Sequence, residues 1–389
     1  MTSSTRTGGG PATARVVLVH DSLTRRGGPE RVLLHLAESL EDPVIVTAAY
    51  DPGSTFPEFS KFPVHALRDD AGRSAARVGA RGGVNAAMFR SLDLSGADLV
   101  VASTTGFAHH VRHPRKAIYW HSAPPGEQGG DGTTGAGAVR TPPVAAHLRR
   151  AGREAALDSS LHATNSYRTA QRLQAVYGIE PEVVHPPLDP SRLGPSLAEP
   201  PWPPRCLVVS RLAAGERVDV AIAACRETGI PLTVIGEGPD ERRLREMADG
   251  SVTFVPPVSD PVLADAYRSH SVVLCPGRDH FGLVPLEAGY VGRPVVASSC
   301  GGAMETVLHR ETGWLVGGWD PLDWAMGLTA VLQRRWDPLA LRAVAQRFGT
   351  AAFDDGLARW LGALVAPAEA LRTGQEPVAD LATQGLLAS

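Results

Sequence analysis

The first half of the chain alternates between short apolar runs and longer amphipathic segments. The apolar runs are rich in valine and isoleucine, which is the pattern of strands buried on both faces. We expect strands at residues 15–20, 44–47, 97–103, 116–120 and 182–185, and a short strand that ends at 162–166, where Ser166 is a candidate cap for the helix that follows. Apolar residues recur three or four positions apart at 144–157 and 167–177, as on one face of a helix. Strands alternating with helices predict a parallel sheet covered by helices.

A second series of the same kind follows a proline-rich stretch. Four prolines fall within residues 200–204, which favours an extended linker over a packed element. We expect further strands at residues 206–210, 231–235, 252–255, 271–275 and 294–297, and helices at 218–226 and 240–247. Residues 335–364 again have helical spacing. The predicted fold class is therefore α/β, with two parallel-sheet domains.

The length of the chain sets the domain organisation. Its 389 residues are too many for one ordinary core, so two domains are expected. We predict a first domain at residues 14–196, a linker at 197–204, a second domain at 205–345 and a C-terminal helix at 346–365. Residues 1–13 and 366–389 carry few packing signals, and we expect them to be loose.

Composition narrows the class of protein. A net charge of −3 and a pI near 6.5 argue against a general nucleic-acid binder. No apolar run approaches the roughly 20 residues that a membrane helix needs, and the first residues lack a signal-peptide core. We therefore expect a cytoplasmic protein. Five arginines within residues 66–92 are typical of a solvated helix or loop, and the alternative is a peripheral contact with the inner face of a membrane.

The candidate chemistry gathers where strands of the second half end. Beyond the strand expected at 271–275 come Asp279, Gly282, Leu283 and Glu287, and the next strand also ends in a glycine pair. Open parallel sheets bind ligands at the carboxyl ends of their strands. Backbone N–H groups at such turns hold a diphosphate, and carboxylates hold sugar hydroxyls. We expect a site of this kind at these strand ends.

Strand ends elsewhere carry matching residues. Gly27 and Gly28 lie at the junction of the first strand with a helix, where the backbone can approach an anion closely. His121 follows the strand at 116–120 and precedes a proline turn, a position suited to a cleft. Arg211 ends the first strand of the second half, and arginine is an efficient diphosphate ligand.

The stretch DHFGLVPLEA, which begins at Asp279, resembles the signature of retaining nucleotide-sugar glycosyltransferases of family 4. Their pattern is Glu, seven residues, Glu, with Phe-Gly after the first acid. The resemblance implies the GT-B fold, with two facing α/β domains. It assigns Glu287 to the nucleotide ribose, Asp279 to hydroxyls of the donor sugar, and the amides near Gly282 and Leu283 to the sugar phosphate.

The stretch HDSLTRRGGPERV near the N-terminus is similar to the start of the same family. By this resemblance Gly27 and Gly28 lie over the donor phosphates, Asp21 faces the acceptor and His121 lies near the donor sugar. The C-terminal helix is expected to cross back to the first domain. The likeness of both stretches favours the branch that includes GDP-mannose users, with UDP-sugars nearly as well supported.

One residue departs from the family pattern. Members usually carry a lysine five residues after the arginine at Arg211, often as YKRVD, and this chain has GERVD with Glu216 at that position. A carboxylate facing a diphosphate is repulsive, by roughly 4 kcal/mol for two unit charges about 4 Å apart at an effective dielectric of 20. Arg217, the next residue, is a candidate donor ligand in place of the lysine. Asp279 is also one methylene shorter than the usual acid.

The sequence thus predicts a retaining hexosyltransferase that uses a nucleotide diphosphate sugar, with an acceptor that is a glycan, a lipid-linked sugar or a small molecule. No cofactor and no metal are expected, because no Asp-X-Asp pattern stands at a strand end. The main alternative is a non-catalytic homologue that binds the donor or supports another transferase, motivated by Glu216 and Asp279. A sugar-nucleotide epimerase or hydrolase is a further alternative. A pyridoxal-phosphate phosphorylase is disfavoured, because the only lysines, Lys61 and Lys116, lie in the first half.

Overall fold

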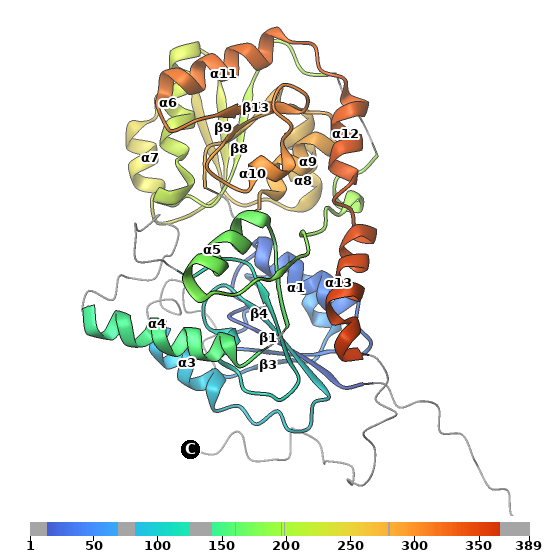
Figure 1. Cartoon of the computed structure of the whole chain (residues 1–389). Coiled ribbons are helices and arrows are strands. Elements are labelled where there is room, and N and C mark those ends of the chain that lie inside the picture. The colour runs from blue at the N-terminus through green and yellow to red at the C-terminus, as the bar shows by residue number, and fades with distance from the viewer. Residues whose placement is uncertain are drawn as a thin grey trace, which may run out of the picture.

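The computed structural model describes residues 14–68, 82–124, 142–159, 161–195, 197, 199–278 and 281–365. Two α/β domains, each built on a parallel sheet, lie one above the other in Figure 1. The predicted fold class is confirmed.

The sheet of the first domain has the strand order β3-β2-β1-β4-β5-β6-β7, with every pair parallel. Its strands are β1 Val16–His20, β2 Val44–Thr47, β3 Val64–Ala66, β4 Leu99–Thr104, β5 Lys116–Trp120, β6 Leu161–Thr164 and β7 Glu182–Val183. Its helices are α1 Gly28–Glu38, α3 Gly82–Arg90, α4 Pro142–Leu157 and α5 Tyr167–Tyr177, with 3-10 turns η1 Pro57–Lys61 and η2 Ala108–His110. The 3-10 turn η3 Pro190–Arg192 packs on the second domain, since Leu188 and Leu193 on either side of it are buried in the core of that domain.

The sheet of the second domain has the order β10-β9-β8-β11-β12-β13, again all parallel. Its strands are β8 Cys206–Val209, β9 Leu232–Ile235, β10 Val252–Val255, β11 Val272–Cys275, β12 Val295–Ser298 and β13 Gly313–Val316. Its helices are α6 Val218–Thr228, α7 Glu241–Met247, α8 Asp260–Arg268, α9 Leu283–Tyr290, α10 Ala303–Thr306, α11 Pro321–Gln333 and α12 Pro338–Gln346, with the 3-10 turn η4 Ala214–Glu216.

The order of strands places a switch point in each sheet. In the first sheet the chain runs outward from β1 to β2 and β3, and then returns to β4 on the other side of β1. In the second sheet the same reversal lies between β8 and β11. Open α/β sheets bind ligands in the crevice outside the strand ends at such points. The turns after β1, β4, β8 and β11 are therefore the places where the fold favours a site.

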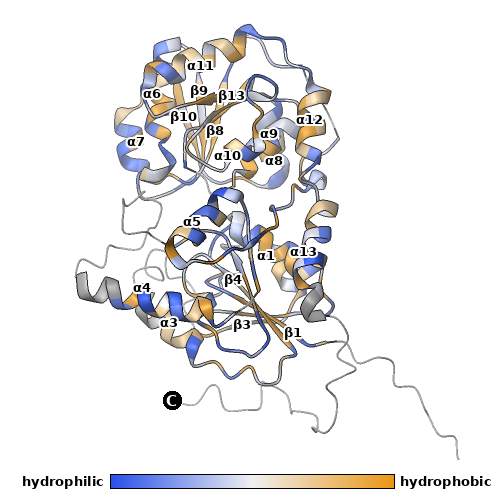
Figure 2. Ribbon diagram, in the orientation of Figure 1, coloured by the Kyte–Doolittle hydropathy of each residue, from blue (hydrophilic) through white to orange (hydrophobic). Residues whose placement is uncertain are grey.

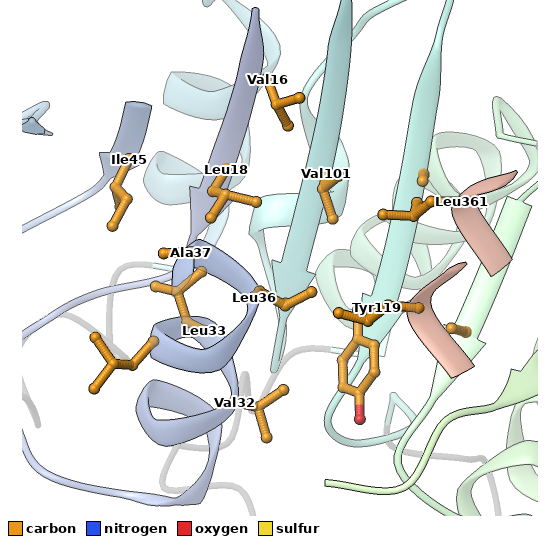
Figure 3. Close-up of a cluster of buried hydrophobic side chains, with 14 of the residues drawn as sticks. Val16, Leu18, Val32, Leu33, Leu36, Ala37, Ile45, Val101, Tyr119 and Leu361 are labelled. Carbon is orange, nitrogen blue, oxygen red and sulfur yellow. The ribbon is translucent and has the colours of Figure 1, made fainter. Parts of the chain in front are cut away.

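Apolar side chains of α1 form the core on one face of the first sheet. Val32, Leu33 and Leu36 recur at helical spacing and are almost completely buried. Figure 3 shows them packed toward Leu18 of β1 and Val101 of β4. Figure 2 shows that the strands inside each domain are hydrophobic, whereas the helices around them carry hydrophilic residues as well.

The last helix, α13 Thr350–Val365, belongs to the first domain in space although it follows α12 of the second. Phe353, Leu357 and Trp360 are buried in the same cluster as the α1 side chains. In the segment between α12 and α13, the carbonyl of Phe348 accepts from the N–H of Leu188 at 2.7 Å. The helical spacing of residues 335–364 thus resolves into two helices with a break, at which the chain passes from one domain to the other (Figure 1).

Two observations bear on the expected surroundings of the protein. In the arginine-rich segment, residues 69–81 lie outside the described part, and Arg68 donates to Asn85 at 2.8 Å. Within the described residues, no helix has the length and apolar character needed to cross a membrane.

Candidate functional site

The two switch points face each other across the domains. Gly28 begins α1 in the first domain, and Leu283 begins α9 in the second. A Cβ atom built on Gly28 would lie 4.0 Å from the Cδ1 atom of Leu283. Gly282, just before α9, has a φ of +89°, a left-handed conformation that favours glycine. The structure therefore brings together the two glycine turns that the sequence predicts as phosphate-binding.

The first glycine turn rests on a buried carboxylate. A Cβ on Gly27 would lie 2.5 Å from Oε2 of Glu30, so any larger residue there would force the buried carboxylate to move. Glu30 is 1% exposed, accepts from Nε of Arg25 at 3.0 Å and lies 3.9 Å from Nε2 of His20. Burial by itself raises the pKa of Glu30, but Arg25 and His20 together outweigh it and lower the pKa to about 2. The turn thus sits over a fixed negative charge that the site prediction from sequence missed.

His121 lies in a hydrogen-bonded group at the ends of three neighbouring strands. Its Nε2 is 2.7 Å from Oγ of Ser103 at the end of β4. The same hydroxyl is 3.1 Å from Nδ1 of His20 at the end of β1, and the two imidazole rings lie edge to face with centroids 6.0 Å apart. Both histidines are buried. The shared serine fixes the orientation of His121, and strand-end positions are the signal by which His20 and Ser103 could have been found.

Asp21 fixes the turn that follows β4. Its Oδ2 accepts from the N–H and the hydroxyl of Thr105 at 2.5 and 2.6 Å, and its Oδ1 accepts from the N–H groups of Phe107 and Ala108 at 2.8 and 2.6 Å. These bonds use both carboxylate oxygens. Asp21 therefore holds in place the turn next to His121, and its contact with an acceptor stays a prediction.

Glu216 faces the start of the turn between β11 and α9, the second glycine turn, which ends at Gly282. A Cβ on Gly277, two residues after β11, would lie 2.6 Å from Oε2 of Glu216 and 3.2 Å from its Cα. The carboxylate therefore lies against the turn that follows β11. Arg211, at the end of β8, is exposed, and within the described residues no hydrogen bond or ion pair engages its guanidinium.

Arg217 is engaged locally. Its Nε lies 3.1 Å from Oδ1 of Asp219, and its Nη2 lies 3.1 Å from Oδ2 of the same residue. Its backbone has a φ of +51° and its guanidinium carbon lies 5.3 Å from the ring centre of Trp319. The charge of Arg217 is thus partly offset by Asp219, and its role as a donor ligand stays a prediction.

Glu287 is buried on α9 and holds two partners. Its Oε1 accepts from Nη1 of Arg192 at 3.1 Å, and its Oε2 accepts from the hydroxyl of Tyr267 at 2.6 Å. A carboxylate has about four acceptor positions, so room remains for hydroxyls of a ligand. Asp279 lies outside the described residues.

Two acidic residues of the second domain tie it to the first. Asp260 accepts from Nη2 of Arg31 in the first domain at 3.3 Å, and it is held in place by Nε and Nη2 of Arg192 at 2.7 Å each. Glu305 accepts from the first N–H groups of α5 at 3.1 Å and from Nε2 of His185 at 2.9 Å. A cavity of about 510 Å³ lies beside this second contact. It is lined by Tyr167, Val184, His185, Glu305, Phe348 and Gly349, among others.

Metal ligands do not gather anywhere in the described ranges. Across them, no group of three or more histidine, cysteine, aspartate or glutamate side chains is placed to hold a metal ion. The four cysteines are free thiols, three of them buried.

Comparison with known families and proteins gives this geometry a context. The family model described as glycosyl transferases group 1 matches residues 203–334. The chain therefore carries a glycosyl transferases group 1 domain. A D-inositol 3-phosphate glycosyltransferase of Rhodococcus erythropolis is 33% identical over 199 residues, which cover 43% of this chain and 45% of that protein. Its counterpart in Pseudarthrobacter chlorophenolicus is 42% identical over 108 residues, which cover 26% of each.

The matches cover only part of each relative. The chain spans about a quarter to just under half of the length of these curated proteins. The resemblance to nucleotide-sugar glycosyltransferases that the sequence predicts is confirmed for this domain, and the mannose-specific branch stays a prediction.

Solved structures extend the likeness to both domains. Anabaena Alr3699/HepE in complex with UDP aligns with a TM-score of 0.66 at 17% identity, covering 90% of this chain and 100% of that one. Sucrose-phosphate synthase from Thermosynechococcus elongatus aligns with a TM-score of 0.68 at 16% identity, covering 90% and 99%. At this identity the likeness concerns the fold, and it confirms the predicted GT-B architecture.

Proposed function

We propose that the protein is a glycosyltransferase that moves a hexose from a nucleotide diphosphate sugar, held mainly by the second domain, to an acceptor held mainly by the first. The observation that carries the proposal is the approach of Gly28 to Leu283 across the two switch points. The group 1 match over residues 203–334 supports the donor class. A site formed from both domains suits a reaction between two bound substrates.

The proposed donor lies along the second domain. Its diphosphate takes the N–H groups at Gly282 and Leu283, where α9 presents the positive end of its dipole. The ribose hydroxyls donate to the remaining acceptor positions of Glu287. Arg211 supplies positive charge at the end of β8. Asp279 is proposed to hold the donor sugar.

The proposed reaction retains the configuration at the anomeric carbon. The bond from that carbon to the diphosphate oxygen breaks, its electron pair leaves with the diphosphate, and the acceptor oxygen bonds on the same face. The leaving phosphate oxygen takes the acceptor proton, so the step needs no separate base and no metal. Positive charge that develops on the sugar lies near His121, whose ring the Ser103 hydroxyl holds in place.

The donor base and the acceptor are open to direct test. GDP-mannose is favoured by the resemblance of the signature stretches, and UDP-sugars by the UDP and UDP-glucose bound in structures of the Anabaena protein. The name of the curated relatives makes a small phosphorylated polyol one acceptor to include. Glycans and lipid-linked sugars complete the set.

A thermal-shift panel of UDP, GDP, ADP and TDP, without added metal and with a chelator, is the decisive experiment. We expect one nucleotide to stabilise the protein selectively, by about 2.7 kcal/mol at 100 times its dissociation constant, because a ligand that binds only the folded state raises stability. The same nucleotide sugar is then incubated with candidate acceptors. If no nucleotide at millimolar concentration shifts the melting temperature, the proposal is wrong.

A non-catalytic donor-binding protein is the second candidate, and the position of Glu216 against Gly277 favours it. A carboxylate at the diphosphate corner opposes the build-up of charge on the leaving group. The variant Glu216→Lys separates the two functions. Turnover that appears only in this variant supports a non-catalytic donor-binding function for the natural protein. Turnover by the unchanged protein excludes that function.

A further inference from the structure

Two arginines share one tryptophan beside the second glycine turn. The guanidinium carbon of Arg278 lies 4.2 Å from the ring centre of Trp319, and that of Arg217 lies 5.3 Å from it. Nε1 of Trp319 donates to the carbonyl of Pro276 at 3.0 Å. This bond fixes the indole next to the end of β11, where the chain turns toward α9. We call Arg217, Arg278 and Trp319 the tryptophan platform.

The two arginines of the platform differ in what they bind. Arg217 is paired with Asp219 through two nitrogens, so its charge is partly offset. Arg278 is half-buried and stacks on Trp319, and within the described residues no hydrogen bond or ion pair engages its guanidinium. A guanidinium has five N–H donors in a rigid plane, and stacking on an aromatic ring leaves those donors directed outward at its edge.

Arg278 lies on the same turn as the position that the acidic side chain of Glu216 approaches. The Glu216 carboxylate meets the turn at Gly277, the residue just before Arg278. A Cβ on Gly277 would lie 2.6 Å from Oε2 of Glu216. A diphosphate at the start of α9 would meet this negative charge. A positive charge on the next residue of the same turn opposes this repulsion, because charges of opposite sign contribute with opposite sign to the energy of a bound diphosphate.

We propose that Arg278, held on Trp319, binds the terminal phosphate of the donor diphosphate and neutralises its charge as the leaving group departs. The inference rests on the proposed function. Arg278 stays protonated throughout and donates hydrogen bonds, while the electron pair of the broken sugar–oxygen bond remains on the diphosphate. Arg278 thus compensates for the negative charge of Glu216. Its planar guanidinium can donate two hydrogen bonds to one phosphate, whereas the lysine that the family usually carries acts as a point charge.

Nucleotide affinities of an Arg278→Gln variant test the proposal. Calorimetry compares the nucleoside diphosphate that binds the unchanged protein best, chosen from UDP and GDP, with the corresponding monophosphate. We expect R278Q to weaken diphosphate binding about tenfold or more, or about 1.4 kcal/mol. The monophosphate, which lacks the terminal phosphate, should bind within about twofold of its original affinity.

The matched control is Arg334→Gln. Arg334 stacks on Trp336 at 5.0 Å in the same domain, at the end of α11, so R334Q removes the same kind of contact outside the turns of the site. We expect it to leave both affinities unchanged. A second variant adds Glu216→Lys to R278Q, and a lysine at 216 should restore most of the lost diphosphate affinity. A merely structural role for Arg278 predicts no such rescue.

The outcomes separate the inference from the proposed function. If the unchanged protein binds the diphosphate and R278Q binds it equally well, Arg278 is not a phosphate ligand and the proposed function stands. Equal losses for the diphosphate and the monophosphate also overturn the inference, because the effect is then not on the terminal phosphate. If the unchanged protein binds no nucleotide, the proposed function fails and the inference fails with it.

Discussion

Asp260 is expected to hold the two domains together, and Asp260→Asn tests this. Its carboxylate accepts two bonds from Arg192 at 2.7 Å and lies 3.3 Å from Nη2 of Arg31. Burial by itself raises the pKa of Asp260, but the hydrogen bonds and charge of Arg192, with the charge of Arg31, lower it below its ordinary value. Asparagine keeps the shape and removes the charge, so the two guanidinium groups then face each other without a carboxylate between them.

The size of the effect follows from burial. Removing one partner of a buried ion pair costs about 3 to 5 kcal/mol, and removing an exposed one about 0 to 1 kcal/mol. The Asp260 side chain is 31% exposed, whereas those of Arg31 and Arg192 are 7% and 15% exposed. We therefore expect D260N to lower the free energy of unfolding by about 2 kcal/mol, between these limits. The melting temperature should fall by about 3 to 5 °C.

The control lies on the same helix. Asp265 pairs with Arg268 at 2.8 Å, but its side chain is 79% exposed, so Asp265→Asn should change stability by less than about 1 kcal/mol. Thermal melting gives the stabilities, and small-angle X-ray scattering gives the radius of gyration, which should rise in D260N alone. Equal melting temperatures and equal radii for the two variants would refute the reasoning.

Acidity provides a second check on the same carboxylate. A group whose pKa is lowered on folding contributes stability above its unfolded pKa, about 3.9 for aspartate, and loses it as the pH falls through the folded value. The difference between the original protein and D260N should therefore be full at neutral pH. It should shrink as the pH falls below about 3.9. A difference that grew on acidification would contradict this assignment.

Three further predictions concern single acids and one glycine. Glu30→Gln should remove about 3 kcal/mol of stability at neutral pH, because folding lowers the pKa of Glu30 from 4.5 to about 2 and each pKa unit is worth about 1.4 kcal/mol. In urea titrations the loss should fade as the pH falls from about 4.5 to 2. A loss that does not depend on pH would show that the charge of Glu30 is not its cause. Gly277→Ala should cost about 1 to 3 kcal/mol through its clash with Glu216, and adding Glu216→Ala should recover part of this in thermal melting. Glu305→Ala should speed hydrogen exchange at the first two amides of α5, which it caps, and unchanged exchange there would contradict the contact.

The alternation of strands and helices was readable from sequence because buried parallel strands are continuous apolar runs. The strand expected at 271–275 is observed as Val272–Cys275, and the helix at 167–177 has the Ser166 cap that its sequence indicates. Two edge strands, β3 and β13, were missed. β3 has only three residues, two of them exposed, and the apolar part of β13 is only three residues long, too short to stand out as a strand.

Two kinds of helix were also hidden from periodicity. α11 carries exposed Leu322 and Met326 besides its buried residues, so its apolar positions do not mark one face. The residues 335–364 read as one helical region because α12 and α13 share the same period. The break between them serves the passage of the chain from one domain to the other, and local sequence does not report that contact.

The candidate site divides in the same way. Glycine turns and acids near strand ends were predicted because local chemistry marks them. Arg31 and Asp260 are separated by 229 positions in the chain, so only the fold brings them together. The direction of Glu216 likewise depends on the turn after β11, which approaches η4 only once the sheet has formed. Sequence therefore located the strand ends, and tertiary contacts decided which side chains meet there.

Arg192 connects the candidate ribose ligand to the contact between the domains. One of its nitrogens donates to Glu287, and two others donate to Asp260, which also receives Arg31 of the first domain. A ligand that draws Glu287 toward its own hydroxyls changes the field in which Arg192 sits, and Arg192 cannot shift without altering its bonds to Asp260. By linkage, the effect is mutual: if ligand binding strengthens or weakens the contact between the domains by some free energy, that contact changes the binding free energy of the ligand by the same amount. D260N should therefore alter both nucleotide affinity and the arrangement of the domains, whereas D265N, which leaves this chain of contacts intact, should alter neither.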